Sequence, residues 1–237
     1  MNLIKYLPNT FTVLNLLSGC LGLLNVYEGN LIHGALFIII GAVFDFLDGF
    51  TARLLKAMSE LGKQLDSLAD LVTFGILPAF LMYALLEEQG TGHLALVSLL
   101  IVVGSAFRLA QFNIDESQNK DFKGLPTPAN AFLIAGLIFV EDSGWTVFSL
   151  IYDSVTGLVL FTLICSLLLN VPLRFMSFKI REYTLKGNEY NLILILLTLF
   201  FLLAYGYRGI FPATLCYLLL SFIQNLIPGK SAPGRLS

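Results

Sequence analysis

Asp45-Phe-Leu-Asp48-Gly49-Phe-Thr-Ala52-Arg53, followed after eight residues by Gly62-Lys-Gln-Leu-Asp66-Ser-Leu-Ala-Asp70, places four aspartates between two apolar segments. Apolar sequence flanks it on both sides: residues 36–44 read Leu-Phe-Ile-Ile-Ile-Gly-Ala-Val-Phe, and residues 71–80 read Leu-Val-Thr-Phe-Gly-Ile-Leu-Pro-Ala-Phe. A charge in hydrocarbon costs about 3 kcal/mol on insertion scales, so intramembrane carboxylates normally face a cavity, a partner or a cation. Four aspartates in one helical hairpin therefore predict a functional site.

The composition assigns the chain to a membrane. Of its 237 residues, 57% are hydrophobic, and the mean hydropathy is +0.81. Soluble domains carry about 45–50% apolar and about 25% charged residues, whereas the charged share here is 13%. We therefore predict an integral membrane protein.

The apolar runs predict an all-α fold, a polytopic membrane helix bundle with about eight transmembrane helices. A spanning helix needs about 20 mostly apolar residues. We expect one membrane domain over residues 1–227 and a disordered tail over 228–237, where prolines, glycines and polar residues gather. No cleavable signal peptide is expected, because the first residues lack a strongly basic region and a cleavage site. The expected segments are 7–26, 31–50, 65–86, 94–112, 126–141, 148–170, 190–207 and 209–227.

The basic residues predict the topology. With eight spans, one side of the membrane carries 13 of the 14 Lys and Arg residues, and the other side carries only Arg208. This asymmetry indicates that both termini are cytoplasmic. Because Arg53 and Lys63 flank the aspartates, the four carboxylates are expected near the cytoplasmic leaflet. The cytoplasmic set is Lys5, Arg53, Lys56, Lys63, Arg108, Lys120, Lys123, Arg174, Lys179, Arg181, Lys186, Lys230 and Arg235.

Helical spacing places the carboxylates on two faces that can meet. Asp45 and Asp48 are three residues apart, and Asp66 and Asp70 are four apart, so each pair shares one helix face. A turn near residues 58–61 reverses the chain between them. The small residues Gly49, Ala52 and Gly62 leave room for a large ligand to approach the backbone.

Four anions at this density predict bound cations. Arg53 alone does not neutralise them, and oxygen ligands suit hard divalent ions such as Mg²⁺ or Mn²⁺. Two such ions sharing carboxylates would suit phosphoryl displacement. Zinc is not expected, since no Cys or His lies nearby. The alternatives are a solvated helix face and the ion pathway of a cation or proton transporter.

A polar loop between the fourth and fifth segments is a second candidate region. It is the longest polar connection and lies on the same side of the membrane as the aspartates. Gly124, Pro126 and Pro128 predict stiff turns at its return to the membrane. Binding residues often lie on such loops; the alternative is a loop that only tethers two helices.

The pattern D-x-x-D-G-x-x-A-R-x8-G-x3-D-x3-D resembles the signature of the CDP-alcohol phosphatidyltransferase family, membrane enzymes that make phospholipid head groups. Every position is filled, by Asp45, Asp48, Gly49, Ala52, Arg53, Gly62, Asp66 and Asp70. Four further stretches are similar to the family's branch of CDP-diacylglycerol–serine O-phosphatidyltransferases, the phosphatidylserine synthases. They are residues 7–19, 65–79, 107–113 and 122–129.

The resemblance implies a mechanism with two divalent cations. Asp45, Asp48 and Asp66 would hold both ions, and Asp70 would hold one and serve as general base for the serine hydroxyl, which displaces CMP from CDP-diacylglycerol. The residues implied to bind CDP-diacylglycerol are Asp48, Gly49, Ala52, Arg53, Ser59 and Gly62.

The acceptor alcohol is predicted less specifically than the metal and nucleotide sites. Arg108 is expected to pair with the serine carboxylate, and Asn113, Gly124 and Pro126 to close over it. Glycerol 3-phosphate, inositol phosphate or choline are alternative acceptors, although a phosphorylated acceptor would need more basic residues near the aspartates. A transporter would move ions without releasing CMP.

The expected location and partners also follow from the resemblance. We expect an integral protein of a prokaryotic cytoplasmic (inner) membrane, with its active site facing the cytoplasm. The expected partners are CDP-diacylglycerol, L-serine, membrane lipids and a second copy in a homodimer. No nucleic-acid partner is expected.

Overall fold

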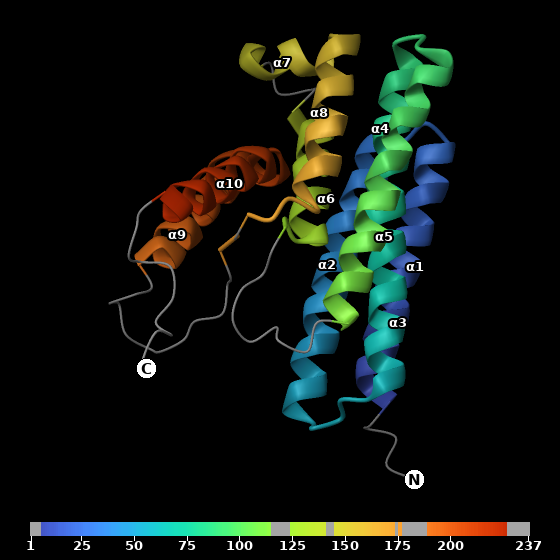
Figure 1. Cartoon of the computed structure of the whole chain (residues 1–237), viewed down its shortest axis with the longest axis vertical. Helices are drawn as coiled ribbons and strands as arrows, with labels where there is room; N and C mark the ends of the chain where they lie inside the picture. The colour runs from blue at the N-terminus through green and yellow to red at the C-terminus, as the bar shows by residue number, and fades with distance from the viewer. Residues whose placement is uncertain (1–5, 115–123, 141–144, 174, 177–188, 227–237) are drawn as a thin grey trace.

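The computed structural model describes residues 6–114, 124–140, 145–173, 175–176 and 189–226, and every regular element in these ranges is a helix (Figure 1). The expected tail at 228–237 and residues 115–123 of the polar loop lie outside the described residues. The α-helices are α1 (Leu7–Tyr27), α2 (Leu31–Leu54), α3 (Glu60–Asp70), α4 (Leu77–Glu88), α5 (Leu99–Ile114), α6 (Thr127–Val140), α7 (Thr146–Tyr152), α8 (Val155–Leu168), α9 (Glu189–Tyr205) and α10 (Ile210–Leu226). A π-helical turn, η2 (Leu71–Ile76), and two 3₁₀ helices, η3 (Gly92–Ser98) and η5 (Gly206–Gly209), connect some of them.

The prediction of an all-helical membrane protein is confirmed, and the expected number of eight spans is not confirmed. Among the described residues, five helical stretches are long and apolar enough to cross a membrane. The expected segments 126–141 and 148–170 yield only 14-residue apolar helices, α6 and α8. The five stretches are Leu7–Tyr27, Leu31–Leu54, Glu60–Glu88, Gly92–Ile114 and Tyr190–Gln224.

One expected segment is interrupted by a helix cap, and the expected break between segments 190–207 and 209–227 is present as a turn. Segment 148–170 is divided because Ser154 has an extended backbone and caps α8, its hydroxyl accepting the Gly157 N–H at 3.2 Å. The last stretch, Tyr190–Gln224, is two helices joined at Gly206, which has φ +59°. There the chain folds back, so that α9 and α10 lie beside each other, inclined to the long helices (Figure 1).

The third span contains the irregularity that matters most for the site. It begins at Glu60, earlier than the expected residue 65, because Ser59 caps α3 by accepting the Gly62 N–H at 3.0 Å. Directly after Asp70 the helix widens into the π turn η2 before α4 continues to Glu88. Pro78 in the first turn of α4 has no N–H to donate, which removes one α-helical hydrogen bond just beyond the π turn. Single π turns of this kind occur frequently at functional sites.

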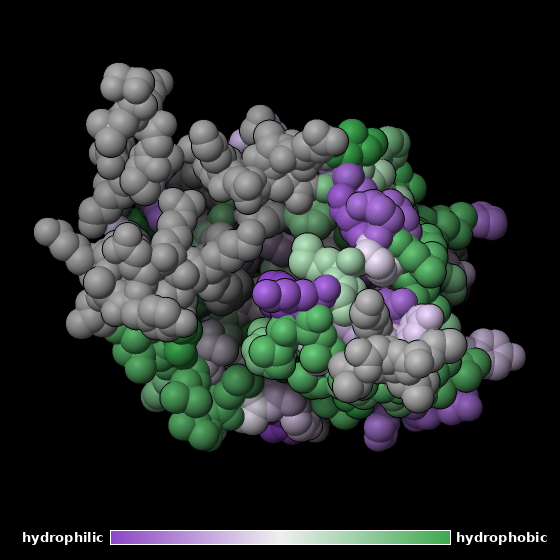
Figure 2. All heavy atoms as spheres, turned by 90° about the horizontal axis from the view of Figure 1, so that it is seen from below, coloured by the Kyte–Doolittle hydropathy of each residue, from purple (hydrophilic) through white to green (hydrophobic). Residues whose placement is uncertain are grey.

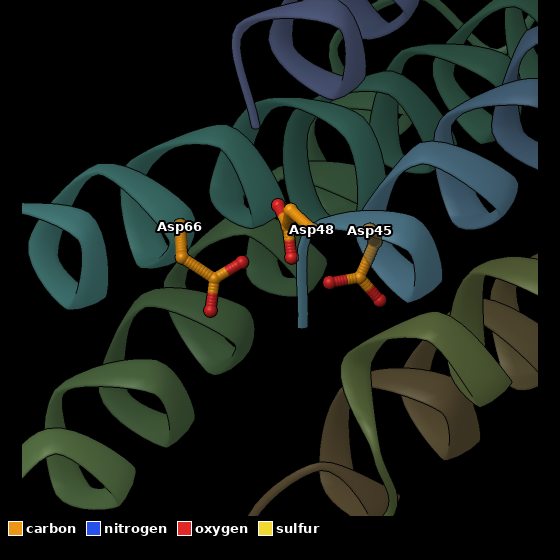
Figure 3. Close-up of side chains that lie close together, drawn as sticks. All are labelled: Asp45, Asp48 and Asp66. Atoms are coloured by element: carbon orange, nitrogen blue, oxygen red, sulfur yellow. The ribbon is translucent and has the colours of Figure 1, made fainter. Parts of the chain in front are cut away.

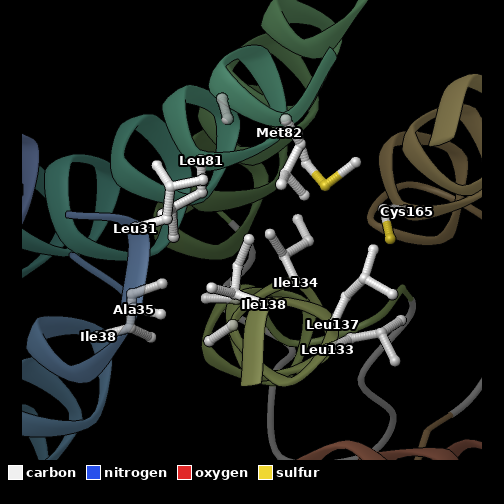
Figure 4. Packing of buried hydrophobic residues seen from close by; sticks show 14 of the residues in the cluster. Leu31, Ala35, Ile38, Leu81, Met82, Leu133, Ile134, Leu137, Ile138 and Cys165 are labelled. Carbon is white, nitrogen blue, oxygen red and sulfur yellow. The ribbon is translucent and has the colours of Figure 1, made fainter. Parts of the chain in front are cut away.

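The apolar core lies between α2, α4, α6 and α8. Met82 of α4, Ile134 and Leu137 of α6 and Cys165 of α8 lie together in it (Figure 4), and all four side chains are fully buried. Helix α6 is buried along nearly its whole length, so it forms the centre of the bundle. Many large apolar side chains of α1, α5 and α9 are exposed instead, as expected for surfaces that face lipid.

Candidate functional site

Three aspartates from two helices converge at one point. Asp45 and Asp48 lie on α2 and Asp66 on α3, and each offers a carboxylate oxygen within 4.8 Å of the other two (Figure 3). Helix α1 contacts both α2 and α3 and so holds the two faces in place. The predicted meeting of the two aspartate faces is therefore present for three of the four carboxylates; we call Asp45, Asp48 and Asp66 the aspartate trio.

The donor set of the trio fits a hard cation. Asp48 is 6% exposed, and its Oδ2, like Oδ1 of Asp66, is buried without a hydrogen-bond partner among the described residues. A buried acceptor left without a donor carries a desolvation penalty of about 1–3 kcal/mol, more when it is charged. A bound divalent ion would satisfy both oxygens, because Mg²⁺ and Mn²⁺ prefer carboxylate ligands. The trio can therefore hold a metal ion.

Asp70, the fourth expected site aspartate, is not a member of the trio. It is buried at the end of α3, and its Oδ1 accepts a hydrogen bond of 3.0 Å from the Asn15 side-chain amide of α1. The three aspartates of the trio remain close enough to Asp70 to repel its charge. The structure thus gives Asp70 a different environment from the three trio carboxylates.

A cavity of about 440 Å³ opens beside the trio at the end of the bundle where α2 ends and α3 begins. Hydrophilic side chains lie among hydrophobic ones on this end of the molecule (Figure 2). Asp48 and Asp66 form part of its wall, together with five residues of α1 and α2, Pro8, Asn9, Thr12, Gly49 and Ala52, and six from the connection and α3, Ala57, Met58, Ser59, Glu60, Gly62 and Lys63.

The two glycines of this wall, Gly49 and Gly62, differ in how closely neighbouring atoms pack against them. A Cβ on Gly62 would lie 3.0 Å from the Ser59 hydroxyl and 3.2 Å from Oδ1 of Asn9, so the start of α1 approaches α3 closely there. A Cβ on Gly49 would meet nothing nearer than the Arg53 guanidinium, at 3.7 Å. Packing therefore does not require a glycine at position 49, and its small size leaves the wall open to a ligand.

Of the other residues expected to bind the nucleotide, two line the cavity and one lies outside it. Ala52 and Ser59 line the cavity, and Ser59 caps α3 at the same time. Arg53 does not line it: its side chain is exposed and lies back along α2 toward Gly49.

Helix α1 contributes three polar side chains to the site that were not among the predicted site residues. Asn9 and Thr12 line the cavity, Thr12 interacts with the Asp48 carboxylate, and Asn15 binds Asp70. Their spacing indicates a common face, because Asn9, Thr12 and Asn15 recur every three residues in a mostly apolar helix.

Two of the expected acceptor residues lie near the aspartates. Arg108 of α5 is 9% exposed, its Nε has no hydrogen-bond partner within the described ranges, and its charge interacts with that of Asp70. Asn113 ties α5 to α3: its amide donates to the Ser67 hydroxyl at 2.9 Å, and its backbone carbonyl accepts the Lys63 ammonium at 3.0 Å.

The other two, Gly124 and Pro126, contribute nothing to the cavity wall. Gly124 has φ +85°, and its N–H donates to the Leu173 carbonyl at 2.9 Å. The neighbouring Leu125 N–H donates to the Leu168 carbonyl at 2.8 Å. This turn is therefore packed against the end of α8.

Comparisons with known proteins find the same family that the aspartate pattern resembles. A family model described as CDP-alcohol phosphatidyltransferase matches residues 5–168. Three similar proteins are each named CDP-diacylglycerol–serine O-phosphatidyltransferase. The Bacillus subtilis protein is 35% identical over 58% of this chain and 78% of its own length, and the Saccharomyces cerevisiae protein is 39% identical over 50% and 44%. The protein of Helicobacter pylori strain J99 is 29% identical over 85% of this chain and 84% of its own length.

Proposed function

The chain belongs to the CDP-alcohol phosphatidyltransferase family, and on that premise we propose that it transfers the phosphatidyl group of CDP-diacylglycerol to the hydroxyl of L-serine, giving phosphatidylserine and CMP. The observation that carries the proposal is the aspartate trio at the edge of a cavity lined by Gly49, Ala52 and Gly62. The names of the similar bacterial and yeast proteins support serine as the acceptor.

The trio would hold the metal, as two Mg²⁺ or Mn²⁺ ions, with Asp70 as a further ligand of one. A divalent cation bound there would neutralise the charge of the diphosphate and of the departing CMP. The cavity wall would receive the cytidine and ribose, and Ser59 would offer its hydroxyl to the nucleotide. Arg53 would swing from its exposed position to a diphosphate oxygen, since its planar fork matches phosphate geometry.

Asp70 would act as the general base. It takes the proton of the serine hydroxyl while the serine oxygen forms a bond to the lipid-linked phosphorus. The bond from that phosphorus to the oxygen of CMP breaks, and CMP leaves with the electron pair. Catalysis then rests on alignment of the two substrates and on charge stabilisation.

Arg108 would bind the serine carboxylate. A buried guanidinium whose Nε–H has no partner among the described residues, within electrostatic range of Asp70, suits a small anionic group held beside the base. Asn113 would hold α5 against α3, and the turn at Gly124 and Pro126 would close this side. Few other cations lie near the aspartates, which favours a zwitterionic acceptor over glycerol 3-phosphate or inositol phosphate.

An acceptor panel on the purified protein tests the function. Labelled CDP-diacylglycerol is incubated with serine, glycerol 3-phosphate, inositol phosphate, choline or no acceptor, and the lipid product is identified by chromatography. We expect a phosphatidylserine product with serine alone. A product with another acceptor would replace serine in the proposal, and ion flux without CMP release would favour the transporter alternative.

Removal of divalent cations should stop the reaction. We expect EDTA to lower CMP release at least about 100-fold, because Lewis-acid stabilisation of a phosphoryl group contributes several kcal/mol. Added Mn²⁺ or Mg²⁺ should restore the rate, whereas Zn²⁺ should not. Continued CMP release in EDTA, with the metal content checked by elemental analysis, would contradict the metal assignment.

Gly49→Ala should separate ligand binding from packing. We expect the KM for CDP-diacylglycerol to rise about 10-fold, since an added methyl group would intrude on the ligand, while the melting temperature stays unchanged. Gly41→Ala is the contrast: its Cβ would meet Thr73 and lie 3.0 Å from Asn15 Oδ1, so overpacking should lower the melting temperature. A large loss of stability in Gly49→Ala would contradict the ligand role.

The location and assembly complete the proposal. Arg53, Lys56 and Lys63 surround the α2–α3 connection, which supports a cytoplasmic position for the cavity in a prokaryotic cytoplasmic membrane. Labelling of Met58→Cys by a membrane-impermeant maleimide in inverted vesicles, and not in sealed whole cells, tests this orientation. The homodimer implied by the family resemblance is tested by light scattering of the purified protein.

A further inference from the structure

Asn15 occupies a position that the reaction scheme above does not use. It lies on α1 and is fully buried where α1 meets α2 and the third span. Its side-chain amide donates to Oδ1 of Asp70 at 3.0 Å, and its backbone carbonyl accepts the Thr73 hydroxyl at 2.9 Å. One residue of α1 therefore contacts both sides of the point where α3 passes into the π turn.

Small residues bring the helices close enough for these contacts. A Cβ on Gly41 of α2 would lie 3.0 Å from Oδ1 of Asn15, and a Cβ on Gly19 of α1 would lie 3.0 Å from the Thr73 backbone. Asn15 is thus enclosed by α2 on one side and by the π turn on the other. A side chain packed in this way has little freedom to rotate.

The hydrogen bond between Asn15 and Asp70 fixes the orientation of the Asn15 side-chain amide. An ionised carboxylate only accepts hydrogen bonds, whereas the asparagine nitrogen only donates them. The nitrogen must therefore face Asp70, which leaves Oδ1 of Asn15 toward Gly41, where it has no hydrogen-bond partner among the described residues. The carboxylate of Asp70 gains a donor that adds no charge.

We propose that Asn15 is the positioning residue of the general base: by holding Oδ1 of Asp70 it directs Oδ2 toward the serine hydroxyl. The inference rests on the function proposed above. The three trio carboxylates repel Asp70, so without the Asn15 donor its side chain would turn to another rotamer. Partners that orient a reacting carboxylate without touching substrate typically change activity by about 10- to 100-fold when removed.

Asn15 could instead only hold the helices together. Its hydrogen bonds to Asp70 and to Thr73 allow this structural role to be separated from the positioning of Asp70. The Thr73 hydroxyl binds the backbone carbonyl of Asn15, which persists in any Asn15 variant. Asn15→Leu therefore removes only the donor to Asp70, in a side chain of similar size. Thr73→Val removes only the contact that docks the π turn on α1.

The experiment compares these variants in the full-length protein in detergent or nanodiscs. For Asn15→Leu we expect kcat to fall about 10- to 100-fold, with the KM for CDP-diacylglycerol within about twofold of wild type. Mn²⁺ affinity for the ion held by the trio alone, measured by electron paramagnetic resonance without substrate, should be unchanged, because the three trio ligands are intact. Asn15→Asp should be at least as slow, since a second carboxylate would face Asp70. Thr73→Val should lower the melting temperature and keep kcat.

Asn25→Leu is the matched control, because the Asn25 amide of the same helix donates, within the described residues, back to the Leu21 carbonyl at 2.9 Å. We expect wild-type kcat for this variant. Wild-type kcat in Asn15→Leu would overturn the positioning role, and so would an equal loss of kcat in Thr73→Val. Failure of the wild-type protein to release CMP with serine would instead refute the proposed function, and is read out separately in the same assay.

Discussion

Asp70→Asn is expected to lower CMP release by about 10²- to 10⁴-fold, the range that a positioned general base contributes. Asparagine has the size of aspartate but cannot take the serine proton. Its side-chain oxygen can still accept the Asn15 amide, so the contact between α1 and α3 is retained. The loss should therefore fall on the chemical step, while CDP-diacylglycerol binding is largely preserved.

Two measurements on the same preparation separate chemistry from binding. Initial rates of CMP release give kcat, and calorimetric titration gives the affinity for CDP-diacylglycerol. Gln64→Ala, an exposed position on the same helix α3, controls for general effects on α3. Undiminished turnover in Asp70→Asn would contradict its role as base.

Asp66→Asn is expected to lower both metal affinity and turnover by about 10²-fold or more, comparable with the loss of one preorganised electrostatic group. Asp66 supplies the only carboxylate of the trio from α3, and its buried Oδ1 has no other partner in the described part of the chain. Neutralising it should remove a ligand without changing the packing. In contrast to Asp70→Asn, substrate binding should weaken as well, because the diphosphate would lose its cation.

Mn²⁺ titration followed by electron paramagnetic resonance measures this effect directly. Glu60→Gln is the matched control: Glu60 is a carboxylate on the same helix and lines the same cavity, but it lies outside the trio. It should keep wild-type Mn²⁺ affinity. Equal weakening in Glu60→Gln and Asp66→Asn would mean that the cavity attracts cations only by its overall charge.

Regular helix geometry explains why much of this site could be predicted from the sequence. The three-residue spacing of Asp45 and Asp48 fixes a shared face, and the turn near Ser59 reverses the chain and brings Asp66 opposite them. These are local rules that neighbouring helices do not change. The apolar flanks similarly predicted the helical membrane fold.

What the sequence did not reveal depends on contacts between distant segments. The bond from Asn15 to Asp70 joins residues 55 positions apart, and it gives Asp70 an environment different from that of the trio. The π turn that follows Asp70, from Leu71 to Ile76, was also not predicted from the sequence. The docking of Gly124 on the end of α8 likewise involves a segment that the expected helices left unplaced.

Serine-dependent CMP release by the wild-type protein is the direct test of phosphatidyl transfer to serine. Purified protein with Mn²⁺ and CDP-diacylglycerol is given isotope-labelled serine, and CMP and labelled lipid are quantified together by mass spectrometry. We expect one molecule of labelled phosphatidylserine to form for each CMP released, and no CMP release without serine. CMP release that is independent of serine, or CMP without labelled lipid, would contradict it.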